Sequence, residues 1–124
     1  MTELAPRNAN AMRSLEQILP SPSGDKLILG ARGDVLTYEA STGAYKNLTN
    51  TPGVAERYPA MSPDGTSVAY VSDESGRGEV QVRAFPSGGG KWQISSEGGA
   101  EPVWSRNGRE LFYRNGTKLM VVDV

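Results

Sequence analysis

The side chains of this chain that could do chemistry are charged groups in polar loops, and no histidine or cysteine accompanies them. The 124-residue sequence contains neither residue type. It therefore lacks Ser-His and Cys-His nucleophile pairs, imidazole and thiolate metal ligands, and the usual proton shuttle near neutral pH. No two carboxylates lie in a pattern that favours general acid-base catalysis. We expect no enzymatic activity, no catalytic residue, no metal site and no cofactor.

The charged loop residues are instead candidates for binding. Solvated charge is the simpler interpretation of each one taken alone. If the loops converge on one face, however, they form a charged mouth whose potential selects a partner. The candidates are Arg32, Glu56, Arg57, Asp73, Glu74, Arg77, Glu97, Glu101 and Arg114.

Three short motifs match known sites by letters and are better explained as turns or loops. Arg32-Gly33-Asp34 spells an integrin-recognition tripeptide, yet Gly and Asp are the residues that a tight turn requires. Gly88-Gly89-Gly90-Lys91 lacks the upstream glycine of a phosphate loop, and Trp92 stands where Ser or Thr would bind magnesium. Asp64 follows proline and precedes glycine, which favours a turn role over a metal-binding or acid role.

The elements that carry these loops follow a pattern that occurs three times. Each copy is a short apolar stretch, a turn with glycine, and a second apolar stretch. The turn glycines are Gly24, Gly65 and Gly108, so the copies are 41 and 43 residues apart. This period is typical of one four-stranded blade of a β-propeller. The copies cover residues 18–29, 60–70 and 103–113.

The fold class expected from this repeat is all-β, with about three blades that are four-stranded antiparallel meanders. Residues 1–124 then form a single propeller module. Its parts are an N-terminal arm at 1–14, blade 1 at 15–50, blade 2 at 57–96 and blade 3 at 100–124. Blade 3 lacks its outer strand. One period before 45–49 lie residues 4–8, where a proline is tolerable only in an edge strand such as the outermost strand of a blade.

Three blades predict an oligomer, because closed propellers have about four to eight blades. An open wedge would leave two apolar faces in water. We therefore expect a homodimer that closes a six-bladed ring head to tail. In that ring, residues 4–8 of one chain would add a strand beside residues 119–122 of the other.

Composition limits the other partners. The 13 basic and 14 acidic residues are interspersed and the formal net charge is −1, so nucleic acid is not an expected partner. No apolar stretch is long enough to span a membrane, and the start has no signal-peptide pattern. We expect no membrane contact and a cytoplasmic location as written, or a periplasmic or secreted one if a leader was removed.

A family resemblance rests on residues that turn chemistry does not demand. Residues 30–35, 46–65 and 72–76 resemble the six-bladed propeller of tricorn proteases. From residue 80 onward, the stretches 83–86, 91–95 and 101–105 resemble TolB-type repeats, which belong to the wider class of WD40-like propellers. The sequence departs from the pattern at Met61, where these repeats usually carry Trp, at Ser23 for the turn Asp, and at Arg106-Asn107 for Pro-Asp.

The resemblance implies a non-catalytic role, because nothing in the chain corresponds to the tricorn peptidase domains. It implies either a gate or path for peptides or a protein-binding platform. We therefore interpret the chain as a scaffold for protein or peptide binding and assembly. Two alternatives stay open. The chain could be an accessory or gating propeller fragment of a tricorn-like or prolyl-oligopeptidase-like serine peptidase, or an engineered or recombined propeller fragment without a selected ligand.

Overall fold

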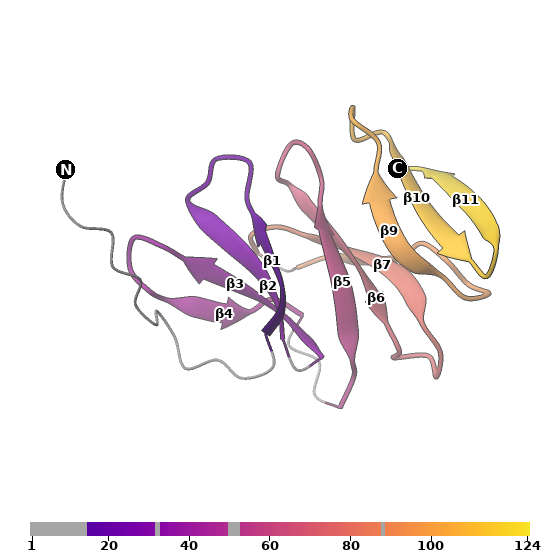
Figure 1. Ribbon diagram of the computed structural model, residues 1–124, viewed down its shortest axis with the longest axis horizontal. Coiled ribbons are helices and arrows are strands. Elements are labelled where there is room, and N and C mark those ends of the chain that lie inside the picture. The colour runs from indigo at the N-terminus through magenta and orange to yellow at the C-terminus, as the bar shows by residue number, and fades with distance from the viewer. Residues whose placement is uncertain (1–14, 32, 50–52, 88) are drawn as a thin grey trace.

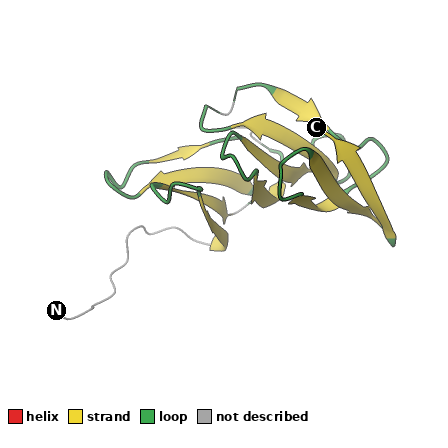
Figure 2. Ribbon diagram, turned by 90° about the horizontal axis from the view of Figure 1, so that it is seen from above, coloured by secondary structure: helices red, strands yellow, loops and turns green. Residues whose placement is uncertain are grey.

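A computed structural model describes residues 15–31, 33–49, 53–87 and 89–124. These residues form three antiparallel β-sheets and contain no helix, as Figures 1 and 2 show. The described part of the chain accordingly has no helix long and apolar enough to cross a bilayer. The expected all-β class with antiparallel meanders is confirmed. The outer strand expected at residues 4–8 lies outside the described residues.

Each sheet is one blade whose strands follow one another in chain order. Blade 1 consists of β1 (Leu15–Pro20), β2 (Lys26–Ala31), β3 (Asp34–Glu39) and β4 (Tyr45–Asn47). Blade 2 consists of β5 (Glu56–Met61), β6 (Ser67–Ser72), β7 (Glu79–Ala84) and β8 (Lys91–Gln93). Blade 3 contains β9 (Ala100–Trp104), β10 (Glu110–Asn115) and β11 (Lys118–Asp123) among the described residues.

The hairpin between the first two strands of a blade has the turn chemistry that its sequence predicts. In blade 2, the Ser62 hydroxyl donates to the Asp64 carboxylate at 2.8 Å, and the Gly65 amide donates to the Ser62 carbonyl at 3.0 Å. Gly65 adopts a φ of 75°, a conformation that L-residues with a side chain rarely adopt. The local sequence therefore determines where β5 reverses into β6.

Two hydrophobic cores lie between the blades, one at each junction. Val68 and Tyr70 of β6 pack with Ile28 of blade 1, whereas Ala69 packs with Leu111 and Tyr113 of blade 3. The split arises because successive side chains of a strand point to opposite faces of its sheet. Blade 2 is consequently covered on both faces.

The first strand of every blade contains an irregularity in its pairing. The register between β1 and β2 shifts between Leu15 and Gln17, and that between β5 and β6 shifts between Arg57 and Ala60. A third shift occurs where β9 pairs with β10. Such β-bulges re-aim side chains and are frequent next to functional sites.

Candidate functional site

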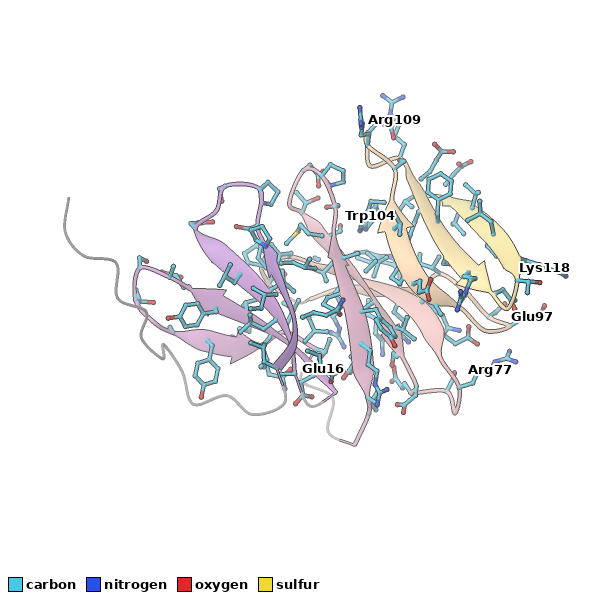
Figure 3. All side chains as sticks on the ribbon, in the orientation of Figure 1. Glu16, Arg77, Glu97, Trp104, Arg109 and Lys118 are labelled. Carbon is cyan, nitrogen blue, oxygen red and sulfur yellow. The ribbon has the colours of Figure 1, made fainter. Side chains whose placement is uncertain are left out.

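The predicted binding residues that the structure describes lie at one end of the blades. Residues 53–55 before β5 and the loops that connect β6 to β7 and β8 to β9 gather at this end, which we call the loop end, opposite the glycine hairpins (Figure 1). In Figure 3, Arg77 and Glu97 lie at the loop end and Arg109 at the opposite end. Arg32 lies outside the described residues. The sequence thus predicts that the charged loop residues share one face, and the structure gives the contacts that each of them makes there.

Hydrogen bonds hold the start of β5 and the residue before it to the loop after β6 and to blade 1. The Ala55 amide donates to the Asp73 carboxylate at 2.8 Å, and the Asp73 amide donates to the Ala55 carbonyl at 3.1 Å. The Glu56 amide donates to the Gly33 carbonyl of blade 1 at 2.6 Å. Glu56 and Asp73, two of the predicted residues, are therefore fixed beside each other.

Glu56 is the most perturbed acid among the described residues. Its side chain is buried at 2% exposure. Burial raises the pKa of Glu56 to about 7, and the nearby Asp34 carboxylate adds to the rise, while Arg83 opposes it. Asp73 and Glu74 contribute further repulsion. Glu56 therefore changes charge near neutral pH, which is a common property of functional carboxyl groups.

A hollow of about 140 Å³ lies beside Glu56, between the first strands of blades 1 and 2. We call it the loop-end hollow. The side chains of Arg57 and Tyr58 are exposed at this position. Its lining comprises Glu16, Gln17, Glu56, Arg57 and Tyr58, with Gly30 and Ala31 from β2. Its volume is well below the roughly 300–1,000 Å³ of drug-sized ligand sites, and it would hold about one side chain.

Glu74 belongs to a polar chain on the same side of blade 2. It accepts a hydrogen bond from Lys91 at 2.7 Å, which holds the pKa of Glu74 below its usual value. The Gln81 amide also approaches it, and the Tyr70 hydroxyl donates to the Gln81 carbonyl oxygen at 3.2 Å. Arg83 in turn donates to the Tyr70 hydroxyl at 2.9 Å. Glu74 is therefore oriented directly by partners from β7 and β8, and the chain of hydrogen bonds continues to Tyr70 in β6.

The sequence analysis missed Glu79, the buried acid that organises the loop before blade 3. Glu79 accepts hydrogen bonds from the Ser95 hydroxyl at 2.6 Å, the Gly98 amide at 2.9 Å and Arg77 Nε at 2.9 Å. Burial alone raises the pKa of Glu79, but these hydrogen bonds outweigh it and hold the pKa below its usual value. The only signal in the sequence is an acid placed directly before alternating valines in β7.

Arg77 is held by that carboxylate and is not grouped with the other predicted residues. Its Nη2 also donates to the Ser96 carbonyl at 2.6 Å. In blade 3, Arg114 forms an ion pair with Glu101 at 3.2 Å, with both side chains more than half exposed. The carbonyl of Glu97 accepts a hydrogen bond from Asn115. The loop end therefore holds the predicted residues at separate places. Glu56, Arg57 and Asp73 lie at the junction of blades 1 and 2, Glu74 and Arg77 have different partners, and Glu97, Glu101 and Arg114 lie at blade 3.

The described residues contain no group of three or more acids that could hold a metal ion. No family model and no curated protein sequence matches the chain. Solved structures do match. A putative TolB from Agrobacterium tumefaciens aligns with 93% of this chain at a TM-score of 0.78 and 16% sequence identity. The chain has the fold of a partial TolB-like propeller. The predicted resemblance is confirmed at the level of the fold.

Two further structures share this TolB-like fold. TolB from Acinetobacter baumannii aligns with 93% of the chain at a TM-score of 0.71 and 19% identity. A prolyl endopeptidase structure aligns with 90% at a TM-score of 0.63 and 14% identity. The chain spans 47% of the Agrobacterium protein, 31% of the Acinetobacter protein and 20% of the peptidase. These matches concern the blades and carry no activity with them.

Proposed function

We propose that this chain is a non-catalytic propeller scaffold that binds a basic peptide or protein segment at its loop end. The observation that carries the proposal is the loop-end hollow, where the buried Glu56 carboxyl adjoins the exposed Arg57 and Tyr58. Ionised Glu56, together with Asp34 and Asp73, makes the local potential negative and attracts a cation. The small volume fits one lysine or arginine side chain, and Tyr58 offers an aromatic surface beside it.

The hydroxyl groups of the repeated turns support a role without catalysis. Ser62 Oγ donates to Asp64 and accepts a hydrogen bond from the Ser67 amide at 3.0 Å. Ser105 Oγ is engaged in the same way, donating to Asn107 and accepting from the Glu110 amide. Both hydroxyls are structural parts of a turn, and neither has a basic partner that would activate it as a nucleophile.

A second candidate is an accessory or gating propeller of a serine peptidase of the prolyl-oligopeptidase-like or tricorn-like kind. The match to a prolyl endopeptidase structure favours it. Incubation of the chain with fluorogenic peptides and with a fluorophosphonate serine-hydrolase probe distinguishes an intrinsic enzyme from a scaffold. We expect neither turnover nor labelling. Labelling of Ser21, Ser62 or Ser105 would overturn the scaffold proposal.

Binding is tested by fluorescence anisotropy with a positional library of fluorescein-labelled nonapeptides that differ only in a central Lys, Arg, Ala or Glu. We expect the Lys and Arg pools to bind, and to bind more tightly at pH 8 than at pH 5.5, because Glu56 ionises between these values. Glu56→Gln and Tyr58→Ala should each weaken binding at least fivefold. The control Arg109→Ser, at the opposite end, should bind like the wild type. Equal binding of all four pools, or of all variants, contradicts the proposal.

A further inference from the structure

Blade 3 presents an uncovered apolar face on the side away from blade 2. In β10, Leu111 and Tyr113 pack toward blade 2, so Phe112 between them points the other way. Its strand partners Val103 and Val121 are 58% and 50% exposed, and Leu119 is 73% exposed. Val103, Phe112 and Leu119 border a hollow of about 450 Å³. We call Val103, Phe112, Leu119 and Val121 the forward face of blade 3.

Blade 1 presents the opposite kind of face. Ile28 of β2 packs toward blade 2, so its neighbours Leu27 and Leu29 point away from blade 2. Ile18, the strand partner of Leu29, is 56% exposed, and Tyr45 on the outer strand is 58% exposed, whereas Leu29 itself is 7% exposed. We call Ile18, Leu27, Leu29 and Tyr45 the backward face of blade 1.

These two faces correspond to the two sides of the interfaces that join blade 1 to blade 2 and blade 2 to blade 3. With the register of the hairpins as guide, Phe112 and Val121 correspond to Ala69 and Val82, which pack against blade 3. In the same register, Leu27 and Leu29 correspond to Val68 and Tyr70, which pack against blade 1. The forward face of blade 3 is therefore of the kind that receives a following blade. The backward face of blade 1 is of the kind that packs onto a preceding one.

The side-chain volumes of the two faces are also matched. Between blades 1 and 2, Ile28 lies in the same core as the large Tyr70. On the forward face of blade 3, the larger Phe112 takes the place of Ile28. On the backward face of blade 1, the smaller Leu29 takes the place of Tyr70. The total volume of this pair is thus nearly kept, which is what a packed interface tolerates best.

We propose that the forward face of blade 3 docks on the backward face of blade 1 of a second copy of this chain, and that two such contacts close a ring of two chains. A heterologous contact of this kind closes a ring when the rotation between copies fits. Two copies of the aligned region equal almost the whole length of the Agrobacterium TolB chain, of which one copy spans 47%. The proposal is independent of binding at the loop end.

The first experiment measures mass in solution by light scattering after gel filtration. We expect about twice the 13.3 kDa of one chain. Leu119→Asp and Ile18→Asp place a charge on one face each, at positions exposed enough for the blades still to fold. The dissociation constant of the dimer should be at least tenfold higher for each variant than for the wild type. Trp92→Asp is the matched control, because Trp92 is 56% exposed on the outer strand of blade 2 and belongs to neither face.

Mixing the two variants tests whether the contact joins unlike faces. In an equimolar mixture, the intact forward face of Ile18→Asp meets the intact backward face of Leu119→Asp, so a dimer should reappear. Contact between like faces predicts instead that only one of the two variants dissociates and that mixing restores nothing. A wild-type chain that is folded by circular dichroism and monomeric at 50 µM overturns the proposal, and so does an open series of larger polymers.

Discussion

Tyr58 in β5 and Glu101 in β9 occupy corresponding positions 43 residues apart, and both adopt positive φ, 54° and 53° respectively. Among the described residues other than glycine, these two are the ones with positive φ. Each lies in the irregular part of its blade's first strand. The repetition indicates that the bulge belongs to the blade itself and is tolerated although it strains a residue with a side chain.

Glycine at one of these bulges should stabilise the chain. Glu101→Gly relieves the left-handed strain and loses only an exposed ion pair with Arg114, which is worth little. We expect a gain of up to about 1 kcal/mol in the free energy of unfolding. The control Glu110→Gly, in the regular strand β10, should lose roughly 0.5–1 kcal/mol. Chemical denaturation of both variants decides the matter, and equal losses would show that the bulge carries no strain.

Glu56 should make the chain less stable as the pH rises. Its pKa is raised from 4.5 to about 7 in the folded state, so between these values the folded chain binds more protons than the unfolded one. The stability that protonated Glu56 contributes to the folded chain is therefore fully present below pH 4.5 and is lost as the pH rises through 7. A shift of one pKa unit corresponds to about 1.4 kcal/mol of free energy, and solvent screening in the open hollow reduces the effect of the whole shift. We therefore expect the free energy of unfolding to fall by about 2 kcal/mol over this pH range.

The control for this dependence is Glu56→Gln, which is neutral at every pH. Unfolding free energies of the wild type and the variant, measured from pH 4 to pH 8.5, should differ most at the alkaline end, with the variant relatively more stable there. A difference that stays constant with pH would show that Glu56 titrates normally.

Glu79 should give the opposite pH dependence. Its folded pKa lies below the ordinary value of 4.5, because the Ser95, Arg77 and Gly98 hydrogen bonds favour the charged form. Its contribution is present above pH 4.5 and disappears as the pH falls through the lower folded value. Glu79→Gln should therefore cost about 2 kcal/mol at pH 7 and distinctly less at pH 3. Thermal melts at both values measure this, and an unchanged melting temperature at pH 7 is the contrary result.

Two corresponding turn glycines should respond differently to alanine. Gly24 and Gly65 have φ of 77° and 75°, so alanine is strained at either position. A Cβ at Gly24 would meet no atom within 4 Å, whereas at Gly65 it would lie 3.1 Å from the ring of Pro22. We expect a loss of about 1 kcal/mol for Gly24→Ala and roughly 1 kcal/mol more for Gly65→Ala. Equal shifts in the melting midpoint of the two variants would mean that the Pro22 ring moves away from the new Cβ without destabilising the fold.

The sequence by itself determined the blades, because their signals are local. A turn such as Ser62-Pro63-Asp64-Gly65 forms its hydrogen bonds among neighbours, and the strands that it joins pair at once across it. Repetition of this unit at a period of about 42 residues was enough to predict an all-β propeller. It was also enough to predict that the charged loops lie at one end, since the meander alternates direction with every strand.

Only the tertiary structure decided how the charged residues of that end are used. The partners of Glu79, namely Ser95 and Gly98, are 16 and 19 residues away in the chain. The raised pKa of Glu56 depends on burial between two blades and on Asp34 from the neighbouring sheet. Charge and burial at these positions are set by what packs across a blade junction, and no residue-by-residue pattern encodes which side chain will meet which across such a distance.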